Sequence, residues 1–481
     1  MADLGGILPG KNVVTSGPPR RAILRLALPT VGAMLSQSIV NEIDIVFFAM
    51  LPCPESSNAQ AALLPSLIVL WLFGGSLSGI GVGTQAFTAR RFAEGKDHEA
   101  GAVLFNAFAF ALVAGILFTI VGYSTMHLIL GKIIKVDGAR AAADAYLQYR
   151  LLGVTSMAMT FAFKAFFDGI GKTHVHLVSA LVMNAINIGL CLILVFGNET
   201  LGVAKMGIAG AGLAGVISTY VGLAIMIGYA LKPEYRERFA PFRLNKLNRT
   251  LMWSIVKLSI PGGIATIAVM TGFALFALIA SKLDEIHPLG TVSAMCPGGD
   301  AEPVNMASTT VIVGILKLTF TGCLAFGTAT ATLVSQSLGE RDGEKAARFG
   351  WASIRLGLLI FGVVGLLETI FAGPILGFVA SSPLVQEHSL NPMRIMGAIT
   401  PVIAVGMILT QALFGAGDTK FVMVAELILH FMCLVPLAYL LGVVVDLGLM
   451  GLWSAAIVYI VLLAIAMVWR FRSGVWQRIK L

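Results

Sequence analysis

The sequence predicts an all-α membrane protein with twelve transmembrane helices. Of its 481 residues, 57% are apolar and only 12% are Asp, Glu, Lys or Arg, and the mean hydropathy is +0.88. Soluble globular chains carry about 25% charged residues, so half of the usual solvated surface is missing. A helix needs about 20 apolar residues to cross a bilayer, and twelve such runs account for the apolar fraction. The net charge of +8 is spread between long apolar runs, which argues against nucleic-acid binding.

The twelve apolar runs follow one another along the chain, separated by short polar connections. In the first half the predicted helices lie near residues 22–50, 61–89, 100–124, 145–167, 174–196 and 207–231. In the second half they lie near residues 251–281, 304–335, 346–371, 393–413, 421–442 and 449–470. The first run is too long for the apolar region of a signal peptide, so we expect it to stay as a span. The connection that holds Lys132, Lys135 and Arg140 is expected to contain a short interfacial helix.

The cations in the connections predict the orientation of the helices. Lys and Arg gather near both ends of the chain and in alternate connections, at 90–96, 164–172, 232–249 and 341–348. Cytoplasmic connections of membrane proteins carry the excess of Lys and Arg. With twelve spans these segments all fall on one side, so we expect both termini in the cytoplasm and the protein in the plasma (inner) membrane.

The second half of the chain repeats short motifs of the first half in the same order. The matching pairs are ILRLALPTVG (23–32) with IVKLSIPGGI (255–264), RLLG (150–153) with RIMG (394–397), and FDGIGKTHV (167–175) with LFGAGDTKF (413–421). Each half has six predicted helices and starts on the cytoplasmic side. The sequence therefore predicts two parallel six-helix repeats, an architecture known among transporters, with lobes at residues 1–240 and 241–481.

These motifs resemble those of the multidrug and toxic compound extrusion (MATE) family. Its first span typically has a proline near the start and Asn-x-x-Asp near the outer end, here Pro29 and Asn41-Glu42-Ile43-Asp44. Its loops after the fourth and tenth spans read approximately Arg-Gly-x-Gly-Asp-Thr, here Asp168-Gly-Ile-Gly-Lys-Thr173 and Phe414-Gly-Ala-Gly-Asp-Thr419. The resemblance implies a twelve-helix exporter with two lobes in a V, coupled to the entry of Na⁺ or H⁺.

Polar residues in the first span form the leading candidate for an ion-coupling site. Gln37, Asn41 and Asp44 stand at i, i+4 and i+7, which places them on one helical face. A charge at mid-membrane costs at least about 2.5–3.5 kcal/mol, so Asp44 is a functional candidate by default. The alternative is an Asp44 close enough to the outer surface to be merely solvated. We favour ion coupling, because a lone surface Asp would not need the Gln and Asn as neighbouring ligands.

The fifth span adds two amides to this candidate site. Asn184 and Asn187 lie one turn apart and could hydrogen-bond a carboxyl on a neighbouring helix or help to bind a small cation. In the resembled family an Asn here is followed four residues later by Asp-Pro, whereas this chain has Cys191-Leu192 after Asn187. The two-carboxylate site of the N-terminal lobe that the resemblance implies is thus reduced to Asp44 alone. One carboxyl suffices for H⁺, whereas Na⁺ needs two or more further neutral oxygens.

The C-terminal half offers three ionisable residues inside predicted spans. Glu426 and His430 are at i and i+4 in the eleventh span, and Lys317 lies well inside the eighth. A Glu–Lys pair would simply hold the lobe together. The same residues could instead form a second titratable site or contact a charged substrate. The sequence leaves both interpretations open.

Nothing in the sequence favours an enzyme or a cofactor. Gly210-Ala-Gly-Leu-Ala-Gly215 matches a dinucleotide-binding pattern, but it lies in an apolar helix without the preceding strand that such a site requires. Close packing of helices on small residues is the better interpretation. We find no Ser–His–Asp set, no pair of carboxylates flanking a pocket and no His-rich metal cluster.

We therefore expect a monomeric antiporter that exports small organic compounds, often cationic or amphipathic, and needs only its substrate and the lipid bilayer. The alternative is a flippase for a lipid-linked oligosaccharide or another lipid-anchored precursor. Such a protein would line its cavity with several cations for a pyrophosphate, and only Lys317 and Arg355 qualify. A membrane scaffold without transport would not need Asp44.

Two cysteines raise the question of a disulfide. Cys53 and Cys296 each precede a proline, in loops that are equivalent under the repeat and assigned to the oxidising outer side. A bridge between them would link the two lobes. We favour free thiols, because a permanent tether would restrain the outward opening that export requires.

Overall fold

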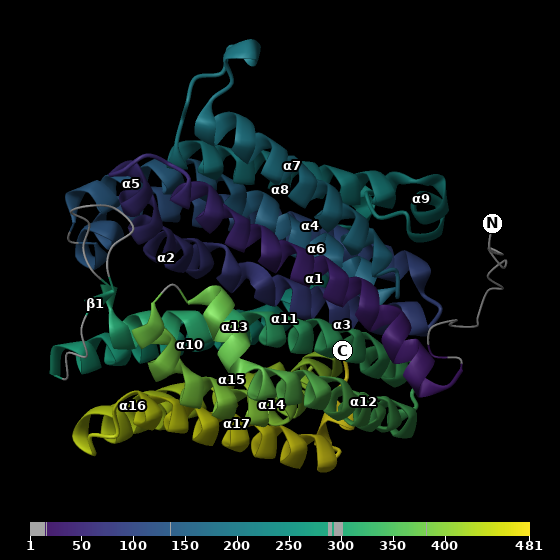
Figure 1. The fold of residues 1–481 in the computed structure, drawn as a ribbon. Helices are drawn as coiled ribbons and strands as arrows, with labels where there is room; N and C mark the ends of the chain where they lie inside the picture. Colours follow the sequence, from purple (N-terminus) through teal and green to yellow (C-terminus); the bar gives the residue numbers. More distant parts are fainter. Residues whose placement is uncertain (1–14, 16, 135, 287–290, 293–301, 381) are drawn as a thin grey trace.

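The computed structural model describes residues 15, 17–134, 136–286, 291–292, 302–380 and 382–481. In this part of the chain, twelve helical segments are long and apolar enough to cross a membrane, which confirms the twelve predicted spans. The long helices run side by side as a bundle (Figure 1). The strands are two short antiparallel segments, β1 (Thr291–Val292) and β2 (Glu302–Pro303), at one end of α10.

The helices of the first half form one side of the bundle. They are α1 (Pro19–Ala49), α2 (Glu55–Phe73), α3 (Gly79–Ala93), α4 (Asp97–Ile133), α5 (Asp137–Arg150), α6 (Val154–Gly169), α7 (His174–Phe196), α8 (Ile208–Leu231) and α9 (Pro233–Phe239). The 3₁₀ turn at Gly75–Ser78 joins α2 to α3, and the turn at Leu151–Gly153 joins α5 to α6. The short interfacial helix expected in the connection before the fourth span is not separate from that span, because α5 continues into α6 as one longer candidate membrane span.

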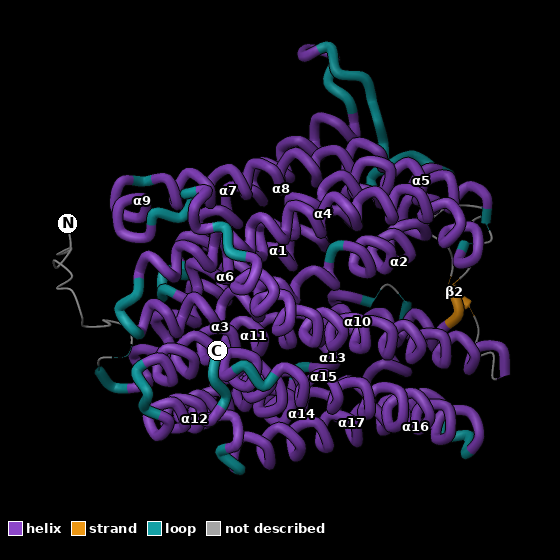
Figure 2. Tube along the Cα trace, turned by 180° about the vertical axis from the view of Figure 1, so that it is seen from behind, coloured by secondary structure: helices purple, strands orange, loops and turns teal. Residues whose placement is uncertain are grey.

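The helices of the second half form the other side. They are α10 (Arg249–Ile286), α11 (Val304–Gly339), α12 (Gly343–Ile370), α13 (Ala372–Val379), α14 (Pro383–Ala416), α15 (Thr419–Ile428), α16 (Val435–Tyr439) and α17 (Gly448–Arg472). The eleventh span combines α15 and α16 with π-helical turns at Leu429–Leu434 and Leu440–Val444. Figure 2 shows the same two groups of helices from behind.

Each half has its own apolar core, and the first helix of each half begins in the core of the other. Ile23 of α1 is fully buried among residues of the second half, and Ile255 of α10 is fully buried among residues of the first. These two isoleucines are the first residues of the aligned motifs ILRL and IVKL. The repeat thus extends to the contact between the lobes, because the first helix of each half packs into the core of the other half in the same way. The exact division at residue 240 stays a prediction.

The two lobes are hydrogen-bonded at the end of the bundle where α3 and α11 terminate. Gln85 of α3 donates to Thr332 Oγ1 at 2.8 Å, and Gln336 of α11 donates to the Gly169 carbonyl at 2.7 Å. Arg90 of α3 donates to the carbonyls of Ala416 and Ile479, both at 2.7 Å. This end of the bundle is closed, and it is the end that the cation distribution predicts to be cytoplasmic.

The structure describes one of the two cysteines for which a disulfide was considered, Cys53. Cys53 is disulfide-bonded, so the favoured expectation of a free thiol is wrong for this residue. Cys296 lies outside the described residues, and the pairing with Cys53 stays a prediction. Cys191, Cys323 and Cys433 are free.

Candidate functional site

Asp44 belongs to a polar cluster that runs from α1 across α7 to α8. It lies five residues before the end of α1 and is half-buried. The Sγ of Cys191 is 3.8 Å from Asp44 Oδ1 and 3.9 Å from Asn187 Oδ1. Asn187 in turn donates to Ser218 Oγ at 3.2 Å. The structure therefore brings Asp44 and Asn187 together through Cys191.

A cation completes this cluster. Arg150, the last residue of α5, lies close enough for its charge to act on the Asp44 carboxylate. Tyr146, one turn earlier in α5, is buried and lies near enough to feel the charge of Arg150. An ionisable residue inside a membrane protein marks a functional site by default, and here a guanidinium lies near the Asp44 carboxylate.

The glycines that mimic a dinucleotide-binding motif explain how Arg150 reaches this position. A Cβ on Gly215 of α8 would lie 2.8 Å from Arg150 Nη1, and one on Gly212 would lie 2.5 Å from the Tyr146 carbonyl. A Cβ on Gly210 would lie 2.6 Å from the Leu194 carbonyl of α7. The three glycines thus let α5 and α7 approach α8, in keeping with the interpretation as helix packing.

The other residues predicted for this site lie around it. Asn184 donates to Ser36 Oγ of α1 at 3.0 Å, two turns away from Asp44 along that helix. Gln37 has an exposed side chain, and the structure does not bring it into the Asp44 cluster. The side chain of Asn41 lies outside the described part of the chain.

In the C-terminal half, Glu426 and His430 share a buried cluster with Tyr459. Tyr459 of α17 donates to Glu426 Oε2 at 3.1 Å, and His430 Nδ1 lies 3.3 Å from the same oxygen. The rings of His430 and Tyr459 are 4.5 Å apart between centroids. His430 lies in a π-helical turn, a feature often found at functional sites. Lys317 of α11 is half-buried. The described contacts of the Glu426 side chain are with His430 and Tyr459.

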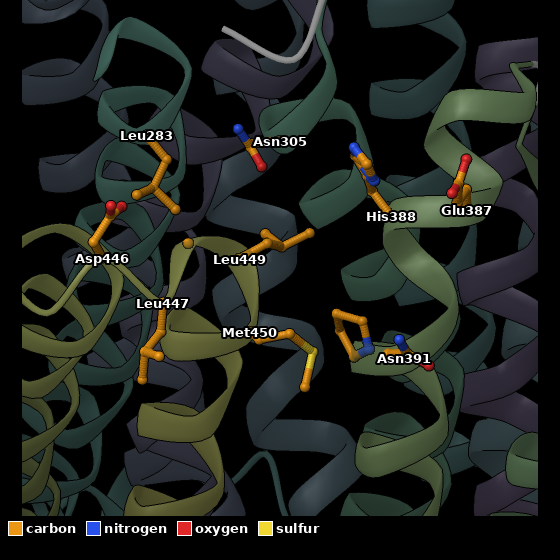
Figure 3. A pocket seen from close by; sticks show the side chains of 11 residues that line it. Leu283, Asn305, Glu387, His388, Asn391, Asp446, Leu447, Leu449 and Met450 are labelled. Carbon is orange, nitrogen blue, oxygen red and sulfur yellow. The ribbon is translucent and has the colours of Figure 1, made fainter. Parts of the chain in front are cut away.

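A pocket lies apart from both clusters. It has a volume of about 370 Å³ and is formed by the ends of α10, α11, α14 and α17 (Figure 3). Asn305, His388 and Met450 are among its lining side chains. All of its walls come from the second half of the chain, so an occupant would not touch Asp44. No group of three or more His, Cys, Asp or Glu that could hold a metal occurs among the described residues.

Sequence reasoning missed three residues of the polar interior. Arg150 stands out in the sequence only as the first residue of the repeated motif RLLG. An Arg within a predicted span is nevertheless itself a signal of a functional site. Tyr146 precedes it by four residues, a spacing that places both on one face. Glu368, buried in α12, stands close to the predicted end of its span, where a carboxyl is easily taken to be solvated.

Comparison with known proteins gives a consistent result. The MatE family model matches residues 29–193 and 286–440, which is more than half of the chain. The probable multidrug resistance protein NorM of Thermotoga maritima is 24% identical over 467 residues, covering 95% of this chain and 93% of that protein. The multidrug resistance protein MdtK of Yersinia pseudotuberculosis is 23% identical over 464 residues, covering 94% of this chain and 95% of that protein.

Solved structures share the fold over the whole chain. A MOP superfamily transporter from Pyrococcus furiosus superposes with a TM-score of 0.85 at 20% identity, covering 99% of this chain and all of that one. A multidrug resistance MATE family transporter in an outward-facing conformation gives a TM-score of 0.83 at 20% identity, covering 98% and 99%. These likenesses support the predicted V-shaped bundle of two repeats.

Proposed function

This chain belongs to the MatE family of membrane transporters, and from that premise we propose that it is a secondary active exporter of small organic compounds. Its relatives named as multidrug resistance proteins support efflux as the direction of transport. The substrate class that we propose is amphipathic and often cationic, held by apolar side chains with few polar contacts. The single observation that carries the coupling mechanism is the cluster of Asp44, Cys191 and Arg150.

The neighbours of Asp44 favour H⁺ over Na⁺ as the coupling ion. Hard cations prefer a shell of oxygen ligands. The described neighbours of this carboxylate are instead a thiol at 3.8 Å and a guanidinium that would repel a second cation. A proton needs one carboxylate oxygen only, and we propose that it binds at Asp44, with Asn187 as a supporting group.

Protonation of Asp44 would change how α1 is held. The anion is attracted to Arg150 of α5, and this attraction ends when the carboxyl becomes neutral. The start of α1 is packed in the core of the other lobe, at Ile23. Hence a change at Asp44 alters a helix that contacts both lobes. Coupling requires that proton and substrate favour different states, since a ligand shifts an equilibrium only by its differential affinity.

The remaining polar residues have supporting roles in this proposal. Asn184 fixes α7 to α1 through Ser36. Gln37 is exposed on α1 and is proposed to contact substrate. Glu426, His430 and Lys317 are proposed as a second polar region of the C-terminal lobe, available to a cationic substrate or for lobe stability.

Dye uptake into inverted membrane vesicles, whose lumen corresponds to the outer side, tests this function. The vesicles receive either an imposed pH gradient or an imposed Na⁺ gradient, each without the other. We expect the pH gradient to drive transport of a cationic dye and the Na⁺ gradient to have no effect. Transport driven by the Na⁺ gradient alone would refute H⁺ coupling. The absence of transport with either gradient would refute secondary export of such dyes.

A further inference from the structure

A buried carboxylate in the C-terminal lobe lies outside every site described so far. Glu368 stands two residues before the end of α12, and only 7% of its surface is exposed. One of its oxygens, Oε1, accepts a hydrogen bond from Thr319 of α11, and Oε2 accepts one from Thr400 Oγ1 of α14 at 2.8 Å. Three helices therefore converge on one carboxyl group.

Glycines bring these helices close enough to build the site. A Cβ on Gly365 of α12 would lie 2.3 Å from the Gly397 carbonyl of α14, and one on Gly397 would lie 3.0 Å from the Cβ of Glu368. Small residues at such a crossing let the backbones touch. Thr400 lies one turn after Gly397, so the close crossing sets its hydroxyl against the Glu368 carboxylate.

No cation of the described chain forms an ion pair with Glu368. Its charge acts on Cys323, a buried free thiol of α11. From α14, Arg394 contacts α12 through its carbonyl, which accepts from Thr369, while its own side chain is exposed. The neighbouring helix α13 contains no ionisable residue. On α1, which also packs against α12, the cations lie in the first two turns, and Asp44 faces α7.

The Thr400 hydroxyl has a second acceptor within reach. Its Oγ1 is 2.8 Å from Glu368 Oε2 and 3.2 Å from the Met396 carbonyl. A hydroxyl has one hydrogen to donate and two lone pairs that accept. Beside an anionic Glu368 it donates to the carboxylate. Beside a neutral Glu368 it can donate to Met396 and accept the carboxyl hydrogen, so neither charge state leaves a polar atom unpaired.

We propose that Glu368 is a proton-binding site of the C-terminal lobe, and that Thr400 is a positioning residue that stabilises both protonation states by reversing its hydrogen bond. A buried carboxylate without a cation is costly in a membrane, and a proton is the ligand that removes its charge. The lobe then carries a titratable group independent of Asp44. Its use as a second coupling site rests on the proposed function, whereas proton binding does not.

Infrared difference spectroscopy of the purified transporter in lipid nanodiscs, titrated with pH, tests this site. Protonation creates a carboxylic C=O stretching band, and we expect Glu368→Gln to remove one component of that band from the titration. Glu387→Gln is the matched control, because Glu387 of α14 is exposed and should contribute no buried component. If Glu368→Gln does not fold, Glu368→Asp should move the component instead of removing it. A titration unchanged by the folded variant would overturn the proposal.

The role of Thr400 has its own spectroscopic readout. Thr400→Val removes the partner of the neutral carboxyl, so the C=O band should move to higher frequency, and Thr400→Ser should restore it. Thr369→Val is the control, since the Thr369 hydroxyl bonds to the carbonyls of Gly365 and Arg394 and not to Glu368. A band that Thr400→Val leaves in place would refute the reversal. These spectra need no substrate, so a failure here is distinguishable from a failure of export.

Discussion

The Sγ of Cys191 in α7 lies 3.8 Å from Oδ1 of Asp44 in α1. Position 191 is where the resembled family pattern has an aspartate. This chain therefore places a thiol against the carboxylate that we propose as the coupling group. A positive charge acts on Asp44 from Arg150 of α5.

Cys191→Asp should change the pH dependence of export. It places a second carboxyl within one turn of Asn187 and next to Asp44, and two close carboxylates repel each other so that one keeps its proton. The pH profile of dye uptake into inverted vesicles measures the effect. Cys191→Ser is the control and should keep the original profile. A normally expressed Cys191→Asp protein with an unchanged profile would mean that position 191 does not act on the site.

Arg150→Ala should impair export and lower stability by about 1–3 kcal/mol, the cost of leaving a buried polar partner unsatisfied. The variant removes the cation whose charge acts on the Asp44 carboxylate and on the buried Tyr146. Thermal unfolding and dye efflux are measured together. Arg140→Ala, on the same helix but in an exposed pair with Asp137, should behave like the wild type. Equal effects of the two variants would argue against a specific role for Arg150.

Arg90→Ala should open the closed end of the bundle. The variant loses donors to the carbonyls of Ala416 and Ile479, and a hydrogen bond from a charged group contributes about 1.5–3 kcal/mol. We expect the open population to rise on the order of tenfold or more, since about 1.4 kcal/mol is a factor of ten. Thr88→Cys, at a fully buried position of the same helix whose hydroxyl makes no described hydrogen bond, reports this as faster labelling by an impermeant maleimide.

The control for that experiment is the next residue of the same helix. Arg91 pairs with Glu94 and Glu99 at the surface and makes no described contact with the second half of the chain. Arg91→Ala should leave the labelling rate unchanged. If Arg90→Ala also leaves it unchanged, the hydrogen bonds of Arg90 do not hold the lobes together.

Non-reducing peptide mapping should recover Cys53 linked to Cys296. Cys53 is disulfide-bonded, and Cys191, Cys323 and Cys433 are free. The three free thiols should be alkylated after denaturation, which provides an internal control. Recovery of the Cys53 and Cys296 peptides as free thiols after oxidative preparation would exclude the bridge.

The helices and their number could be predicted because apolar runs and connecting charges are local properties of the sequence. The repeat was also visible, and the aligned residues Ile23 and Ile255 begin it in both halves. What the sequence did not reveal is how these residues pack, each in the core of the opposite lobe. Packing across 232 positions has no local signal.

The candidate site was predictable only on the helices whose polar residues follow a family pattern. Asp44 and Asn187 were found in this way, whereas Arg150 reaches the site because Gly215 lacks a side chain. That contact joins two helices far apart in sequence. Glu368 was missed for the same reason, because its partners Thr319 and Thr400 come from two other helices.

The most direct test of the account is proton-driven export by Asp44→Asn in reconstituted proteoliposomes. The substitution keeps the size and hydrogen bonding of the side chain but removes its titration, so the protein should fold and insert normally. With an imposed pH gradient the wild type should move a cationic dye against its concentration gradient, and Asp137→Asn, an exposed control, should do the same. We predict that Asp44→Asn shows no gradient-driven transport. Full proton-driven transport by Asp44→Asn would contradict the central claim that Asp44 couples proton entry to export.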